Sequence, residues 1–163
     1  MTSIPTIERP GFAQGYQTEG LPDFDPTPWP EALARMNQTL NCWVATTRAD
    51  GRPHATPVWG LMMNDTFIFS TSPESVKARN LQRDGRCLVQ MQVEEDVFLL
   101  EGVATPADPA LVASPAFLDL YEAKYQYRPA PEDMVGTGWV VTPITILAWN
   151  EKSMLESQTR YRF

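Results

Sequence analysis

The hydrophobic residues of this chain first change their period close to residue 41. From Trp29 onward, Leu33, Met36 and Leu40 lie three or four positions apart, which puts them on one face of a helix. Beyond them, apolar and polar residues alternate in short runs that end in turn residues, a pattern typical of strands. We therefore expect a helix that begins at Trp29, followed by a mainly β region.

Turn signals divide the β region into a meander of short strands. Asp50-Gly51 is a hairpin signal, and Asn64-Asp65 and the acidic residues 94–96 mark two later turns. Pro143 interrupts the last run and is expected to divide it into two strands. The predicted strands cover residues 42–47, 54–63, 66–71, 86–93, 97–105, 139–142 and 144–149.

Two further helices are expected between these strands. Ser72-Pro73-Glu74 supplies a cap, a residue suited to the first helical position and a carboxylate at the positive end, and Gly85 ends this helix. The other helix covers residues 115–125 and precedes a Pro- and Gly-rich loop at residues 128–138. The pattern predicts a mainly β chain with a few helices (α+β), folded as a closed or partly closed antiparallel barrel. A β-sandwich is the alternative.

Residues 1–28 differ from the rest of the chain. They contain five prolines and three glycines, a composition that forms neither a helix nor a strand ladder. We expect an arm that lies on the surface or on a partner, and a disordered tail is the alternative. Residues 29–163 are expected to form a single domain.

Composition narrows the classes of protein. Hydrophobic residues make up 43% and charged residues 20% of the 163 positions, which is typical of a globular domain. The chain shows neither a signal peptide nor an apolar run of the roughly 18 residues that a membrane span needs. Cys42 and Cys87 lie inside predicted strands, which favours free thiols in a reducing compartment. The net charge of −7 opposes nucleic-acid binding, so we expect a cytoplasmic protein that binds neither membranes nor nucleic acids.

Several kinds of chemistry are excluded by what the sequence lacks. His54 is the only histidine, so no multi-histidine metal site exists, and two cysteines are too few for a zinc motif. There is neither a nucleophile-elbow motif nor a P-loop, and Gly136-Thr137-Gly138 lacks the third glycine of a dinucleotide fingerprint. If the protein is an enzyme, a bound organic cofactor supplies the chemistry.

Two stretches have the features of a cofactor site. One runs from Ser70 and Thr71 into a helix start with free backbone N–H groups, and Lys77 and Asn80 share one face of that helix. This arrangement suits an anion, although a capped surface helix with solvated cations is the alternative.

The other stretch lies on the predicted strand after the first hairpin. Alternation separates Thr56 and Val58 from Pro57 and Trp59, and Pro57 removes a ladder donor. The strand is therefore an edge, a bulge or a place where a flat ligand replaces the neighbouring strand. Trp59 as ordinary core is the alternative.

Six short motifs occur in a fixed order along the chain. They are Val44-Ala45-Thr46-Thr47, Asp50-Gly51-Arg52-Pro53-His54, Thr56-Pro57-Val58-Trp59, Phe69-Ser70-Thr71, Lys77-Ala78-Arg79-Asn80-Leu81 and Thr159-Arg160-Tyr161-Arg162-Phe163. Together they resemble the pyridoxamine-phosphate-oxidase-like superfamily, and more narrowly its flavin/deazaflavin-dependent oxidoreductase branch. The resemblance implies an antiparallel split β-barrel that forms a homodimer with two cofactors at the interface.

The resemblance also implies contacts with the cofactor. Residues 56–59 would line the ring system, Ser70 and Thr71 would meet the ribityl or phosphate groups, and Lys77 and Asn80 would hold the phosphate. Contacts with the ring edge and from the second subunit would come from Gln90, Trp149 and Arg160. The full set of implied cofactor-binding residues is Thr56, Pro57, Val58, Trp59, Ser70, Thr71, Lys77, Asn80, Gln90, Trp149 and Arg160.

The implied function is a redox enzyme in which FMN, or the deazaflavin coenzyme F420, exchanges a hydride with a small organic substrate. Ser75 stands where some relatives carry a second basic residue, which leaves the choice of cofactor open. The alternatives are a non-enzymatic flavin- or haem-binding split barrel, with His54 as the haem ligand, and a structural dimer. Pyridoxamine phosphate oxidase activity itself is not expected, because its paired basic tail is missing.

The C-terminal residues 159–163 combine two cations with two aromatic side chains. This combination suits packing on a flat ring and pairing with an anion, as the resemblance implies for Arg160. The alternative is that Tyr161 and Phe163 only seal the bottom of the barrel.

Overall fold

The computed structural model describes residues 4–13, 15–16 and 19–163. The nine strands in these ranges are β1 (Thr6–Glu8), β2 (Cys42–Thr47), β3 (Pro53–Val58), β4 (Gly60–Met63), β5 (Thr66–Ser70), β6 (Arg86–Val93), β7 (Asp96–Pro106), β8 (Gly138–Asn150) and β9 (Thr159–Arg162). The helices are α1 (Trp29–Met36), α2 (Val76–Arg83), α3 (Pro109–Val112), α4 (Pro115–Tyr125), α5 (Pro131–Met134) and α6 (Met154–Ser157), with the 3-10 turn η1 (Glu151–Ser153). None of the helices in the described ranges is long and apolar enough to cross a membrane.

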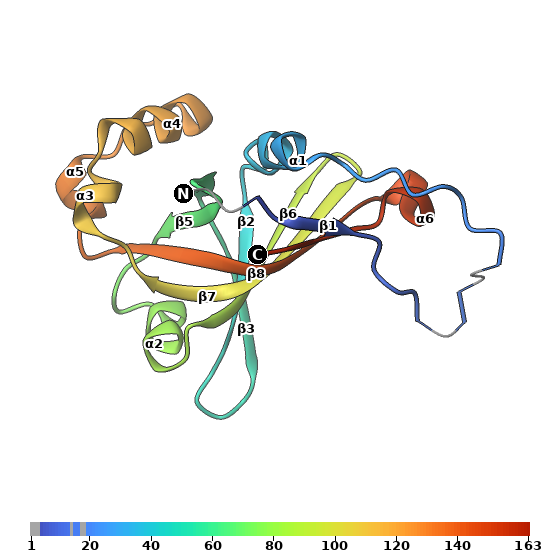
Figure 1. The fold of residues 1–163 in the computed structure, drawn as a ribbon. Helices are drawn as coiled ribbons and strands as arrows, with labels where there is room; N and C mark the ends of the chain where they lie inside the picture. Colours follow the sequence, from blue (N-terminus) through green and yellow to red (C-terminus); the bar gives the residue numbers. More distant parts are fainter. Residues whose placement is uncertain (1–3, 14, 17–18) are drawn as a thin grey trace.

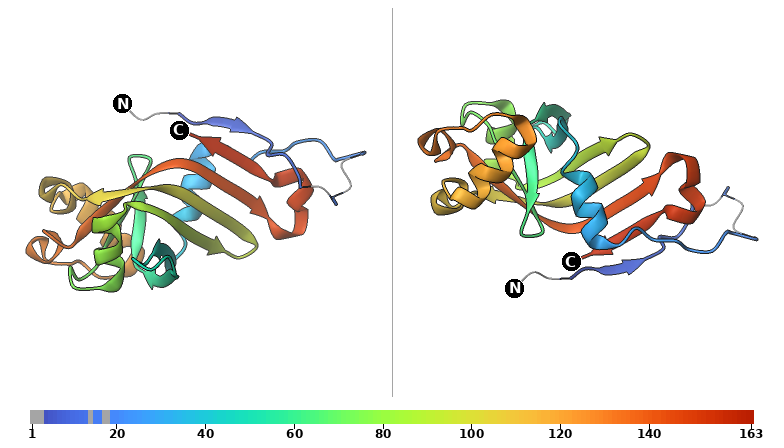
Figure 2. Two further views of the ribbon diagram at one scale, coloured as in Figure 1. Left: turned by 90° about the horizontal axis from the view of Figure 1, so that it is seen from below. Right: turned by 90° about the horizontal axis from the view of Figure 1, so that it is seen from above.

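All the strand pairs are antiparallel, and they form one curved sheet. Its order is β1-β9-β8-β7-β6-β2-β3, and β4 joins it through β5, which pairs with the start of β8. The consecutive strands β3 and β4 do not pair with each other, so the barrel is split between them. Helices α3 to α5 lie at one end of the sheet and α6 at the other (Figures 1 and 2). The predicted mainly β class and antiparallel split β-barrel are confirmed.

Pro143 lies inside the continuous strand β8, so the predicted division into two strands is wrong. β5 pairs with residues 138–141 and β9 with residues 145–148, which leaves β7 as the only neighbour of residues 142–144. A strand accepts a proline where one of its sides is unpaired, because no ladder hydrogen bond is lost there.

The returning strand expected over residues 54–63 is two strands that meet in a corner at Trp59. Gly60 follows the corner and has no room for a side chain. An added Cβ would lie 2.3 Å from Cζ of Phe67 and 2.8 Å from the carbonyl oxygen of Ile68. The close approach of β4 to β5 therefore requires glycine, and the chain leaves the β2–β3 hairpin at this point.

The barrel interior holds the larger of two hydrophobic clusters, and Tyr161 of the C-terminal strand is fully buried in it. The ring of Tyr161 packs against Trp29 at a centroid distance of 5.1 Å, and its hydroxyl donates to the carbonyl of Thr27 at 2.6 Å. The ring of Phe163 also packs against Trp29, edge to face, at a centroid distance of 5.1 Å. The two aromatic residues of the tail therefore seal the barrel, as the alternative interpretation expected.

Part of the N-terminal arm is a strand, which corrects the expectation that residues 1–28 form no ladder. β1 pairs with β9 and extends the sheet. Arg9 then donates to the carbonyls of Pro22 at 2.6 Å and Leu155 at 3.1 Å, and its guanidinium lies over the ring of Phe24. Through β1 and Arg9, parts of the arm are thus attached to their own chain.

Gly102 provides a test of the central β7–β8 pair. A Cβ at this position would lie 2.4 Å from the carbonyl oxygen of Thr142, a backbone atom that cannot rotate away. We expect Gly102→Ala to lower the free energy of unfolding by about 1–3 kcal/mol in urea denaturation. Gly11→Ala is the control, because no atom lies within 4 Å of its added Cβ. An unchanged midpoint for Gly102→Ala would contradict this account of the pairing.

Candidate functional site

The outer edge of β3 has no strand partner among the described residues, and helix α2 packs against this strand. The side chains of His54 and Thr56 point to the same side of β3. Nδ1 of His54 and Oγ1 of Thr56 are both buried without a hydrogen-bond partner in the described chain. Buried polar atoms rarely lack a partner, so these two atoms mark a place where a ligand can donate or accept.

Helix α2 begins at Val76 and not directly after Ser72 as predicted. Its cap is Ser75, whose hydroxyl accepts a hydrogen bond from the N–H of Ala78 at 3.1 Å. Ser72 closes the preceding turn, where its carbonyl accepts from the N–H of Ser75 at 3.0 Å. The later start brings the Ser75 hydroxyl within 3.2 Å of Oγ1 of Thr71.

Lys77 completes a cationic cluster at the start of α2. Its ammonium donates to Oγ1 of Thr71 at 3.1 Å, and no carboxylate of the described chain pairs with it. Burial lowers the pKa of Lys77, which shows that the ammonium lies partly out of water. One ammonium and two hydroxyl groups, beside a helix start, form a site suited to a phosphate.

His54 experiences the same positive charge. The pKa of its imidazole is lowered from 6.5, first by burial and then by the charges of Arg48 and Lys77. The three residues therefore lie close enough to interact, although they come from two separate elements. An anion bound here would reverse the effect and raise the pKa of His54.

Ser70 and Asn80, two of the predicted phosphate ligands, use their side chains within the chain. The hydroxyl of Ser70 donates to Oγ1 of Thr137 at 2.8 Å. Asn80 is buried, and its amide donates to Oγ1 of Thr46 at 2.9 Å while its oxygen accepts from Arg83 at 3.5 Å. Asn80 thus ties α2 to β2, and the structure brings together Thr71, Ser75 and Lys77 at the start of α2.

The corner after β3 is held by helix α4. The hydroxyl of Tyr125 accepts from the N–H of Gly60 at 2.8 Å, and Nζ of Lys124 donates to the carbonyl of Gly60 at 2.6 Å. The ring of Trp59 stacks on Tyr125 at a centroid distance of 4.6 Å and an angle of 8°. Trp59 is 46% exposed, so it is not ordinary core, and α4 fixes the position of its indole.

The other predicted site residues lie on the opposite face of the sheet. Strand register places one row of side chains across this face from β3 to β1. The row is Pro57, Trp43, Gln90, Leu99, Leu147, Arg160 and Glu8. Arg160 and Arg162 both donate to the Glu8 carboxylate, at 3.1 and 2.7 Å, and they lower its pKa. Trp149 lies one row away, opposite Val97.

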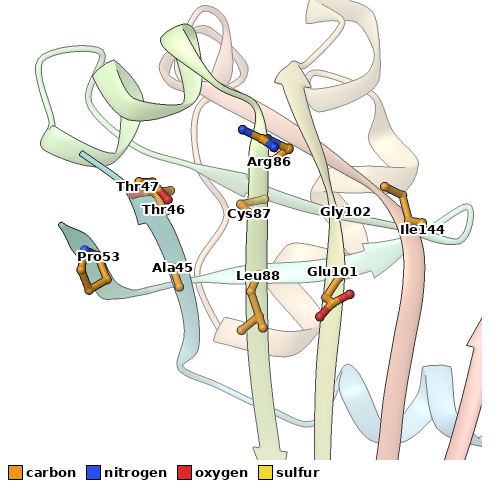
Figure 3. A pocket seen from close by; sticks show the side chains of 10 residues that line it. All are labelled: Ala45, Thr46, Thr47, Pro53, Arg86, Cys87, Leu88, Glu101, Gly102 and Ile144. Atoms are coloured by element: carbon orange, nitrogen blue, oxygen red, sulfur yellow. The ribbon is translucent and has the colours of Figure 1, made fainter. Parts of the chain in front are cut away.

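This face is apolar and only partly covered within one chain. Trp43 is 46% exposed and Ile144 57% exposed. A shallow hollow of about 430 Å³ crosses strands β2, β6, β7 and β8 near Leu88, Glu101 and Ile144 (Figure 3). Such a surface is unusual on a monomer and is typical of an interface.

The predicted cofactor-binding set does not include Ser75 or Arg48, and it considers His54 only as the haem ligand of the alternative function. Ser75 could have been found as a second candidate cap, because the hydroxyl of a serine before a helix can accept from the N–H group three residues later, here that of Ala78. The contribution of His54 and Arg48 depends on contacts between the β2–β3 hairpin and α2, for which the sequence offers no local signal.

A family model described as "Pyridoxamine 5'-phosphate oxidase" matches residues 29–150. The chain belongs to this pyridoxamine 5'-phosphate oxidase family. The match includes the β2–β3 hairpin, the α2 cluster and the apolar face, and it confirms the predicted superfamily. A search of curated proteins finds no match.

Solved structures of other proteins share the fold at low sequence identity. The protein Rv2991 from Mycobacterium tuberculosis superposes with a TM-score of 0.66 at 20% identity, over 78% of this chain and 87% of that chain. An "F420 Reductase" gives 0.56 at 19% identity, over 69% and 93%. A pyridoxamine 5'-phosphate oxidase-related, FMN binding protein from Nostoc punctiforme gives 0.56 at 18% identity, over 82% and 88%.

The single histidine of this family member makes the electrostatics of the site measurable. We expect His54 to titrate below 6.5 in the ligand-free protein, because burial, Arg48 and Lys77 all disfavour its charged form. Lys77→Ala should raise this pKa, since one positive charge disappears. Because the folded state favours neutral His54, its contribution to stability is complete above pH 6.5 and is lost as the pH falls through the lowered pKa. NMR titration of the imidazole checks these expectations, and a pKa at or above 6.5 in the ligand-free protein would contradict them.

Proposed function

We propose that this protein is a flavin- or deazaflavin-dependent oxidoreductase that exchanges a hydride with a small organic substrate. The observation that carries the proposal is the cluster of Lys77, Thr71 and Ser75 beside the partnerless polar atoms of His54 and Thr56. The cationic cluster fits a phosphate, and the free edge of β3 fits a planar polar ring.

The chain's own residues would bind and orient such a cofactor. Lys77, Thr71 and Ser75 would hold the phosphate, and Oγ1 of Thr56 would face the polar part of the cofactor. Trp59, fixed on Tyr125, would border the substrate. When bound, a flavin or deazaflavin supplies the hydride chemistry, so no side chain has to act as a strong acid or base. Similar structures described as an F420 reductase and an FMN binding protein support a cofactor of this type.

We propose further that two chains form a homodimer through the apolar face of the sheet. A two-fold axis along the central strands β6 and β7 would bring the β3 end of one chain opposite the β8–β9 end of the other. The row of side chains would then carry Arg160, and Trp149 beside it, toward the partner's β3 edge. This arrangement would explain why the implied cofactor-binding residues lie on both faces of the sheet within one chain.

The phosphate assignment is tested with Lys77→Ala. We expect the affinity for its cofactor to fall by the equivalent of roughly 1.5–3 kcal/mol, the range for a hydrogen bond to a charged group, with little change in thermal stability. Lys152→Ala is the control, because Lys152 pairs with Glu95 on the far hairpin. Fluorescence titration of the ligand-free protein with FMN and with coenzyme F420 measures the effect. Unchanged affinity for both would remove Lys77 from the site.

The redox assignment is tested by the visible spectrum and by reoxidation of the bound, reduced cofactor. In the absence of oxygen, we expect the reduced flavin or deazaflavin to regain its oxidised absorbance only when an electron-accepting substrate is added. A haem Soret band, or a reduced cofactor that no quinone, nitroaromatic or conjugated acceptor reoxidises, would contradict the oxidoreductase proposal.

The dimer is tested with Leu99→Arg, which places a charge at the centre of the apolar row. We expect the mass in light scattering to fall from about twice 18.3 kDa to 18.3 kDa. Leu120→Arg is the matched control, because Leu120 is equally a leucine but is exposed on α4, away from this face. A wild-type protein that is already a monomer at micromolar concentration would overturn the proposal.

A further inference from the structure

We propose that the substrate of this protein is a flat aromatic or conjugated molecule with a single carboxylate, and that Lys124 and Trp59 recognise it. The ammonium of Lys124 would pair with the carboxylate, and the open face of the Trp59 indole would stack on the ring. The inference rests on the proposed function, because it names the class of molecule that such an oxidoreductase would bind at the corner after β3.

The first observation is a hollow beside this corner. Its volume is about 440 Å³, and its lining residues are Leu40, Asn41, Trp59, Lys124, Tyr125 and Gln126. A second hollow of about 240 Å³, next to Leu61 and Leu120, is also bordered by Lys124. None of the residues in the Lys77 cluster lines either hollow. The corner therefore offers room for a small organic molecule at a place separate from that cluster.

The second observation is the unneutralised charge of Lys124. Its Nζ donates to the carbonyl of Gly60 at 2.6 Å, and no carboxylate of the described chain pairs with it. An ammonium has three donors, so two of them lack an acceptor within the described ranges. The side chain is partly buried, and this burial lowers the pKa of Lys124. A bound anion would supply the missing counter-charge.

The fold itself does not require a cation at this position. The hydroxyl of Tyr125 lies 2.8 Å from both the nitrogen and the carbonyl oxygen of Gly60, so it can hold the corner without the lysine. The carboxylates of Asp119 and Glu122, which lie on the same helix as Lys124, both pair with Arg128. Lys124 is therefore neither needed for the corner nor neutralised by its own helix, which favours a role in binding.

The third observation is the fixed aromatic surface beside this charge. One face of the Trp59 indole lies on the ring of Tyr125 at an angle of 8°, so the indole is held in one orientation. Its other face stacks on no aromatic ring of the described chain, and Trp59 remains exposed. Leu40, which is also exposed, adds apolar surface to the same hollow. An indole face held in place favours a flat ring as the ligand.

The lining of the hollow also excludes other kinds of ligand. It contains no carboxylate, so a cationic molecule would find no counter-charge there. One ammonium neutralises one negative charge, and the net charge of −7 opposes a ligand with more. A monocarboxylate therefore matches the hollow better than a cation or a phosphate ester.

The experiment compares 2-naphthoate with 2-naphthamide, which has the same ring system without the charge. NMR titration of the whole chain measures both affinities for the wild type, Lys124→Met and Trp59→Leu. We expect Lys124→Met to weaken 2-naphthoate about tenfold and 2-naphthamide less than about twofold, because only the acid uses the ammonium. Trp59→Leu should weaken both about three- to tenfold, because both rings stack.

Two controls establish where the acid binds. Lys152→Met should change neither affinity, because Lys152 pairs with Glu95 on a distant hairpin. Lys77→Ala should also leave the affinity for 2-naphthoate unchanged, which separates this hollow from the phosphate cluster. In the wild type, the indole N–H signal that Trp59→Leu removes should shift when 2-naphthoate is added.

Four results would overturn the inference. They are no binding of 2-naphthoate at millimolar concentration, equal wild-type affinities for the acid and the amide, equal losses of both ligands with Lys124→Met, and a loss of 2-naphthoate binding with Lys77→Ala as large as that with Lys124→Met. The failure of the proposed function looks different. The visible spectrum would then show no flavin or deazaflavin, while 2-naphthoate would still bind at Lys124.

Discussion

Gly60 is the residue at which the geometry of the whole site is determined. Its lack of a side chain lets β4 approach β5 closely, and Tyr125 and Lys124 bind its N–H and carbonyl groups. The chain therefore turns sharply after β3 and cannot continue along β2 as a longer hairpin. The outer edge of β3 is left free as a consequence, and the apolar face ends at this edge. Helix α4, which is distant in the sequence, thus holds the corner after β3 in place.

The charged residues of the fold fall into a paired set and an unpaired set. Carboxylates outnumber cations, and seven of the 13 Arg and Lys residues pair with one in the described chain. Lys77 and Arg48 are among those without a carboxylate partner there, and both lower the pKa of His54. Clustered like charges destabilise a folded protein, so such a cluster is normally retained for binding. An anion would relieve the repulsion among these groups and would also supply partners for the orphaned atoms of His54 and Thr56.

Local signals in the sequence predict the elements that depend on local interactions. The strands over residues 42–47 and 86–93 and the helix over residues 115–125 occur as predicted, because pattern, caps and packing agree there. Strands β1 and β9 were not predicted, since each has only three or four residues and exists through pairing with a distant segment. The start of α2 was displaced because Ser72 and Ser75 can both cap a helix. Only packing against the sheet, through Ala78, Asn80 and Leu81, selects the later start.

The candidate site shows the same limit. Thr71 and Lys77 could be predicted, because a hydroxyl-rich strand end followed by a helix is a local pattern. The charge that Arg48 adds to them could not, because the hairpin and α2 meet only in the fold.

The C-terminal strand β9 has a buried aromatic side and a side that carries two arginines. Side chains alternate along β9, so Tyr161 points into the barrel while Arg160 and Arg162 point to the apolar face. The aromatic part of the tail is thus explained by the core, and this explanation leaves the arginines unaccounted for. Glu8 neutralises them only in part, because one carboxylate is shared between two guanidinium groups. The remaining positive charge lies at the end of the apolar row, where a dimer partner's β3 edge would meet it.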